Sequence, residues 1–138
     1  MNVIRQSARF SASPKELFSI YTDSKKHSAA TGVKASVSAR VGAKFTAFEG
    51  MLSGQNLMVV PGKMIVQRWR SKHFRKSDPD SILTLIFFRA GKGGCIDLVH
   101  VNVPDQAYSM SRKAGARITG NPGEPISRND RQRYKNHP

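Results

Sequence analysis

The spacing of apolar and polar positions divides residues 1–108 into one strand, two short helices and a run of further strands. Residues 3–10 alternate loosely, which predicts a strand. Residues 14–21 and 24–31 have helical start and stop signals. After residue 32 the period becomes two, which predicts strands at residues 34–39, 43–50, 51–60, 63–70, 81–90 and 95–103.

The two helices are defined by their ends. Ser13 can cap the first helix, with Pro14 at its first position and Glu16 completing a Ser-x-x-Glu capping box. Leu17, Phe18 and Tyr21 then share one helical face, with Ile20 beside it. The second helix is predicted to start after Asp23 and to end at Gly32.

The short connections between the later strands predict an antiparallel meander and an α+β fold of about six to seven strands. Pro61 and Gly62 form one predicted turn, and the Gly-Lys-Gly-Gly run at residues 91–94 forms another. Such a sheet needs cover for its apolar face, and two short helices cannot supply it. One long closing helix is therefore missing: residues 109–138, where it should lie, are rich in glycine and proline and read as a disordered basic tail.

The formal net charge of +14 raises the possibility of a nucleic-acid or membrane partner. The best candidate is "RWRSKHFRK" at residues 68–76, where five basic residues are interleaved with Trp69 and Phe74, as in single-strand binders. The alternative, which we favour, places Trp69 in the core with Arg68 and Arg70 on the solvated face. A nucleic-acid partner is accordingly unexpected.

No catalytic or metal-binding set is visible in the sequence. Cys95 and His100 lie five residues apart on one strand, so they should point to opposite faces. The four histidines lack metal-site spacing, and residues 91–94 lack the features of a phosphate loop. Asp78 and Asp80 flank a proline in a polar turn, so they do not form an acid–base pair. We expect no enzyme activity, no metal and no cofactor.

Two polar residues are expected to point toward the apolar interior. Gln67 shares a strand face with Ile65 and Trp69, and His100 shares one with Ile96 and Leu98. An apolar space with few polar groups is the general form of a small-ligand site. An ordinary core with two hydrogen-bonded polar residues is the alternative, and the sequence does not decide between them.

Several segments together resemble a known family: "FSASPKELFSIYTD", "VGAKFTAFEGMLSGQNLMVVPGKMIVQRWR" and "VHVNVPD". They resemble the START-like SRPBCC superfamily and, within it, the activator of heat-shock-protein-90 ATPase homologue family. The resemblance covers residues 3–107 in order and implies a helix-grip fold. The family often has a Trp-Pro pair where this chain reads "HFRKSDPDS".

The resemblance implies either a small hydrophobic molecule held between sheet and helix or contact with a chaperone. The full eukaryotic activator also uses a separate N-terminal domain, for which we expect no room in this chain. The candidate cavity residues are Phe18, Tyr21, Phe45, Gln67, Trp69, Ile96, Leu98 and His100.

Family members close with an aromatic helix of the pattern Gly-Trp-x-x-Tyr-Tyr-Trp, which this chain lacks. The codons allowed for residues 113–127, read one nucleotide earlier, permit Gly-Trp-Arg-Glu-Asp-Tyr-Trp-Lys-Pro-Trp-Arg-Ala-Tyr-Leu. Codon degeneracy permits many peptides, but three tryptophans at the family's positions favour a frameshift near residues 108–111. We thus expect a family domain over 1–108 and an aberrant tail over 109–138.

The N-terminal sixteen residues have no apolar run of the kind found in signal peptides, and no apolar run in the chain approaches twenty residues. We expect a cytoplasmic protein without a membrane span.

Overall fold

The computed structural model describes residues 2–108 and 112. Its elements, in chain order, are β1 (Asn2–Phe10), α1 (Pro14–Thr22), α2 (Ser24–Thr31), β2 (Lys44–Ala47), β3 (Leu52–Val60), β4 (Met64–Ser71), β5 (Ser81–Ala90), β6 (Gly93–Val103) and the 3₁₀ helix η1 (Asp105–Ala107). The predicted α+β architecture is confirmed, with six strands in the sheet. The expectations for residues 109–138 lie outside the described residues, apart from Arg112.

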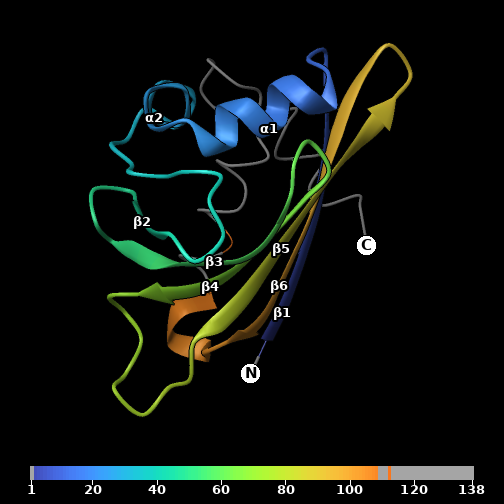
Figure 1. Cartoon of the computed structure of the whole chain (residues 1–138). Helices are drawn as coiled ribbons and strands as arrows, with labels where there is room; N and C mark the ends of the chain where they lie inside the picture. Colours follow the sequence, from blue (N-terminus) through green and yellow to red (C-terminus); the bar gives the residue numbers. More distant parts are fainter. Residues whose placement is uncertain (1, 109–111, 113–138) are drawn as a thin grey trace.

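All six strands form one antiparallel sheet in the order β1-β6-β5-β4-β3-β2. Strands β2 to β6 follow one another as the predicted meander, and β1 closes the far edge beside β6. Both α1 and α2 lie on the same side of this curved sheet (Figure 1). We call the sheet face toward α1 the inner face and the opposite one the outer face.

The start of α1 is the predicted one. The Ser13 hydroxyl accepts a hydrogen bond from the Glu16 backbone N–H at 3.2 Å, and Pro14 occupies the first turn. Asp23 caps α2 by accepting from the Lys26 N–H at 2.9 Å, and Gly32 ends it with a φ of 74°. These local signals place α1 so that its apolar side faces the sheet.

No strand forms at residues 34–39, so that prediction is wrong. Only an isolated bridge between Ser36 and Thr46 forms there. The Ser24 hydroxyl instead bonds both the N–H and the carbonyl of Val37, at 2.9 and 3.1 Å, and Ser28 holds Ala35 in the same way. Side chains of α2 thus use backbone groups that a full strand would pair with a neighbour.

Side chains along the strands alternate between the two faces of the sheet, as predicted. On β4, Ile65, Gln67 and Trp69 are buried on the inner face, while Arg68 and Arg70 are half-buried on the outer face. The turn after β3 has Gly62 at a φ of 74°, as the Pro-Gly pair predicted. The core therefore lies between α1 and the inner face.

Candidate functional site

The eight residues predicted to line a cavity all lie buried on the inner side of the sheet. They come from α1, β2, β4 and β6, and none is more than 8% exposed: Phe18, Tyr21, Phe45, Gln67, Trp69, Ile96, Leu98 and His100. The structure thus brings together residues that are up to 82 positions apart in the sequence.

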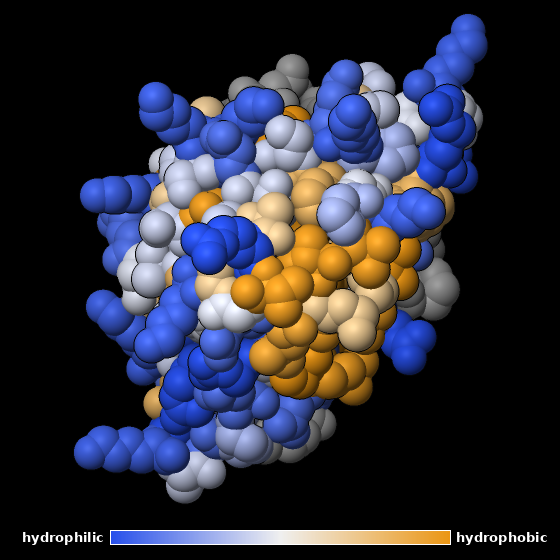
Figure 2. Space-filling view, in the orientation of Figure 1, coloured by the Kyte–Doolittle hydropathy of each residue, from blue (hydrophilic) through white to orange (hydrophobic). Residues whose placement is uncertain are grey.

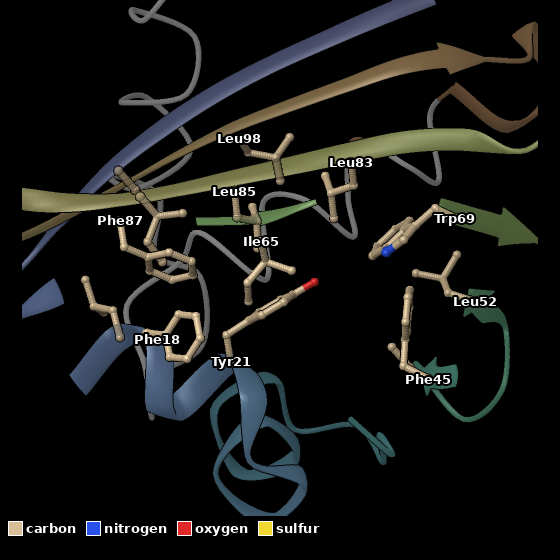
Figure 3. Packing of buried hydrophobic residues seen from close by; sticks show 14 of the residues in the cluster. Phe18, Tyr21, Phe45, Leu52, Ile65, Trp69, Leu83, Leu85, Phe87 and Leu98 are labelled. Carbon is tan, nitrogen blue, oxygen red and sulfur yellow. The ribbon is translucent and has the colours of Figure 1, made fainter. Parts of the chain in front are cut away.

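Their aromatic rings form two neighbouring groups (Figure 3). Phe18 and Tyr21 of α1 pack against Phe87 of β5, with ring centroids 5.5 and 6.4 Å apart. Farther along the sheet, Trp69 lies 5.2 Å from the His100 ring and 6.1 Å from the Phe45 ring. Edge-on and tilted contacts between aromatic rings stabilise a fold by more than the burial of their apolar area alone.

Gln67 joins these two groups through its side-chain amide. Its Oε1 accepts from the Tyr21 hydroxyl at 2.7 Å and from Trp69 Nε1 at 3.0 Å. Its Nε2 donates to Asn56 Oδ1 at 2.8 Å, and Asn56 in turn donates to the carbonyls of Ser38 and Arg40. The Gln67 oxygen therefore accepts two hydrogen bonds within the protein, and its amide nitrogen donates one.

The two buried histidines are held neutral by their surroundings. His100 Nε2 lies 2.7 Å from the Ser81 hydroxyl, and burial lowers the pKa of His100 to about 4. His27 Nδ1 lies 2.8 Å from the Tyr21 carbonyl, and burial also lowers its pKa. Burial raises the pKa of the Tyr21 phenol, so that side chain is a neutral hydrogen-bond donor. Both histidines are thus hydrogen-bonded to neighbouring groups inside the domain.

Sequence reasoning missed Gln6 of β1. Gln6 is 3% exposed, and its Nε2 donates to the Arg112 carbonyl at 3.2 Å. Its Oε1 is buried and has no hydrogen-bond partner among the described residues. The available signal was its inward position between Ile4 and Ala8 in an alternating strand.

An apolar floor separates Gln6 from Gln67. Gln6 is paired with Leu98 on β6, Leu98 with Leu85 on β5, and Leu85 with Ile65 on β4. These three apolar side chains are at most 2% exposed. Three strand spacings give a floor about 14 Å wide. Polar side chains thus lie at both ends of this buried apolar floor.

The reactive groups considered from the sequence do not meet. Cys95 lies on the outer face, 3.5 Å from the Ser7 hydroxyl, whereas His100 is on the inner face. Burial raises the pKa of the Cys95 thiol, which disfavours the thiolate a nucleophile needs. Among residues 2–108 and 112, no three His, Cys, Asp or Glu side chains group as metal ligands would. Cys95 and His100 therefore do not form a nucleophile–base pair.

Of the basic segment at residues 68–76, only residues 68–71 belong to β4, where Arg68 and Arg70 lie on the outer face. Trp69 is 2% exposed and points inward, so it offers no stacking surface to a nucleic acid. Arg68 and Arg70 both bind the Asp80 carboxylate, at 2.9 and 3.1 Å. The hydrogen bond from Arg68 is the main cause that lowers the pKa of Asp80. The predicted orientation of this segment is confirmed.

Comparison with known proteins gives consistent matches. Residues 11–119 match the family described as Activator of Hsp90 ATPase homolog 1-like protein. A Dictyostelium discoideum protein named activator of 90 kDa heat shock protein ATPase homolog is 24% identical over 115 residues, which are 83% of this chain. This chain spans only 30% of that relative's length.

Solved structures show the same fold. An HSP90 activator from Plasmodium falciparum superposes with a TM-score of 0.65 and 26% identity, covering 74% of each chain. The Aha1 dimer from Colwellia psychrerythraea gives a TM-score of 0.71 at 14% identity, covering 86% of this chain and 90% of that one. In the described part of the chain, no helix has the length and apolar character needed to cross a bilayer.

Proposed function

We propose a function from the family to which the chain belongs, the Activator of Hsp90 ATPase homolog 1-like protein family of the SRPBCC superfamily. This domain is a non-catalytic binding module that holds a small hydrophobic molecule between α1 and the inner face of the sheet. The eight buried residues named above, together with Gln6, form the binding region.

The Oε1 of Gln6, which has no hydrogen-bond partner in the part of the chain that the structure describes, is the observation that carries this proposal. A buried acceptor without a donor costs about 1–3 kcal/mol, so native structures usually satisfy such groups. A ligand with one hydroxyl or N–H group would supply the donor. The apolar floor beyond Gln6 would take an extended aliphatic or ring-containing body.

The far end of the floor should recognise shape rather than a hydrogen-bond donor. Gln67 Oε1 already accepts from Tyr21 and Trp69, so a ligand donor gains no hydrogen bond there without breaking one. The ligand class that fits is therefore an elongated apolar molecule with one polar end. Its length would approach about 14 Å, the width of the floor.

Titration with 1-decanol and with decyl methyl ether tests this proposal. The two probes have similar apolar bodies, but only the alcohol can donate to Gln6 Oε1. Trp69 is the sole tryptophan of the chain, so its fluorescence reports binding nearby. We expect the alcohol to bind about tenfold more tightly, since one net hydrogen bond is worth about 1 kcal/mol or slightly more.

The variant Gln6→Leu should abolish the preference for the alcohol, while Gln55→Leu on the outer strand face should retain it. Equal affinity of the two probes for the unchanged protein would contradict the role of Gln6. Absence of saturable binding by either probe would contradict ligand binding itself.

Chaperone binding is a second candidate, favoured by the 26% identity with the Plasmodium falciparum HSP90 activator. Because the chain spans 30% of its curated relative, the activity of that whole protein is not assumed for this domain. Isothermal titration of the chain into purified Hsp90 tests association, and the ATPase rate of Hsp90 tests stimulation separately. Saturable association would support the co-chaperone role; no heat of binding would count against it.

The domain boundary is also proposed. We infer a folded family domain over residues 1–108 and a tail over 109–138 that arises from a frameshift near residues 108–111. Resequencing the gene across codons 105–130 decides this point. A corrected frame that encodes the aromatic closing helix supports the inference, and confirmation of the present frame overturns it.

A further inference from the structure

The outer face of the sheet exposes an unusual amount of apolar surface. Figure 2 shows hydrophobic side chains gathered in one continuous area over the strands. Six large apolar side chains on β1, β3 and β5 are 37–53% exposed: Val3, Leu57, Met58, Val60, Ile86 and Phe88. Apolar surface that is contiguous, unlike scattered single residues, marks interaction sites.

Strand register places these side chains next to one another. Met58 of β3 is paired with Val66 of β4, and Val60 is paired with Met64. Met64 is in turn paired with Ile86 of β5. Directly paired residues have Cβ atoms about 5 Å apart on the same face. The result is an apolar centre across three adjacent strands, which α1 and α2 do not cover because they lie on the inner side (Figure 1).

Arginines border this apolar centre on two sides. Arg68 of β4 is held by Asp80 at 2.9 Å and donates to Gln55 Oε1 at 3.0 Å. On the opposite edge of the sheet, β1 presents exposed Arg5 and Arg9 on the outer face.

Among the described residues, the acidic side chains of this face, Asp80 and Asp97, already accept hydrogen bonds within the domain. Asp97 accepts a hydrogen bond from the Ser7 hydroxyl at 2.5 Å. Asp80 is shared between Arg68 and Arg70. The face thus has an apolar centre with a border that carries excess positive charge.

We propose that this outer face docks a protein surface that has an apolar centre and an acidic border. An apolar centre within a polar rim is the usual anatomy of a protein–protein interface. Methionines such as Met58 and Met64 adapt to irregular apolar partners. Guanidinium groups at the border match carboxylates in geometry as well as charge.

The charge of the chain argues against a second copy as the occupant. Two chains that each carry a formal net charge of +14 repel, and the arginines at this border would meet the same arginines in a two-fold contact. A partner whose border carries carboxylates would instead be attracted to these arginines. This site lies on the opposite side of the sheet from the proposed ligand site, so each can be tested without the other.

A pair of synthetic helical peptides tests the proposal on the full chain. Both have an apolar leucine face, and one is flanked by glutamates whereas the other is flanked by lysines. Fluorescence anisotropy should show that the glutamate peptide binds at least tenfold more tightly at low salt. The preference should shrink as the salt concentration rises, because exposed charges are screened.

Two variants locate the contact, each with a matched control. Ile86→Ser should weaken binding of the glutamate peptide at least fivefold, whereas Val41→Ser should not, since Val41 is 65% exposed in the loop before β2. Arg5→Glu should reduce the charge preference, whereas Lys25→Glu on α2 should leave it unchanged. Circular dichroism establishes that each variant is folded.

Three results would overturn the proposal. The first is equal binding of the two peptides, or binding that Ile86→Ser does not alter. The second is Ile86-dependent sedimentation with phosphatidylserine vesicles but no peptide binding, which would identify a membrane surface. The third is Ile86-dependent self-association in analytical ultracentrifugation, which would identify a second copy as the occupant.

Discussion

Replacing Gln67 by leucine should destabilise the domain more than any comparable change on the outer face. The leucine cannot accept from the Tyr21 hydroxyl or Trp69 Nε1, and it cannot donate to Asn56 Oδ1. Gln67 is 2% exposed, so water cannot readily replace the lost partners. Three buried polar groups lose a hydrogen bond in one substitution.

The expected loss is about 3 kcal/mol in the free energy of unfolding. Each orphaned buried group costs about 1–3 kcal/mol, while the added apolar side chain returns about 1–2 kcal/mol. A net loss of this size is a large part of the stability of a small domain, which is about 5–15 kcal/mol. Tyr21→Phe removes only one hydroxyl and should cost about 1 kcal/mol.

Urea unfolding at pH 7, followed by Trp69 fluorescence and by circular dichroism, measures both values. The double variant Tyr21→Phe/Gln67→Leu should be more stable than the sum of the single losses predicts, by about 1 kcal/mol, because no tyrosine hydroxyl is then left orphaned. A loss below about 1 kcal/mol for Gln67→Leu, or strict additivity in the cycle, would refute the reasoning. The slope of the unfolding curve should stay constant, which checks that the transition remains two-state.

Two further predictions concern pH and backbone packing. Because the pKa of His100 falls from about 6.5 in the unfolded chain to about 4 in the fold, unfolding takes up a proton in that window, and stability should fall as the pH falls from 6.5 to 4, by up to roughly 3 kcal/mol. The lowered pKa of His27 acts in the same direction. Urea midpoints measured across this pH range give the slope of stability against pH. If His100→Gln leaves that slope unchanged, His100 is not its source. Gly54→Ala should destabilise by more than about 2 kcal/mol, since a Cβ there would lie 1.8 Å from the Arg68 carbonyl oxygen and 2.8 Å from the Phe45 ring; a thermal midpoint like that of the exposed control Ser53→Ala would contradict this.

Much of the fold could be predicted because its signals are local. The capping of α1 by Ser13 and the end of α2 at Gly32 depend on residues within one or two turns. The inward positions of Gln67, Trp69 and His100 depend only on the period of two in a strand. These were therefore read correctly from the order of side chains.

Other features depended on contacts between distant segments. Residues 34–39 have a strand-like alternation, but Ser24 and Ser28 of α2 take up their backbone groups from 7 to 13 positions away. That Gln6 Oε1 has no hydrogen-bond partner among the described residues likewise depends on which distant groups surround it. The alternation in β1 shows only that Gln6 points inward.

The sequence by itself determined which residues face inward and the α+β order of elements. Only the tertiary structure decided which inward groups meet, such as Tyr21 with Gln67 across 46 positions, and which apolar residues share the outer face. Periodicity specifies the direction of a side chain relative to its own backbone, because that direction follows from local geometry. The neighbour it meets depends on strand register and on helix placement, which are set by the packing of the whole core.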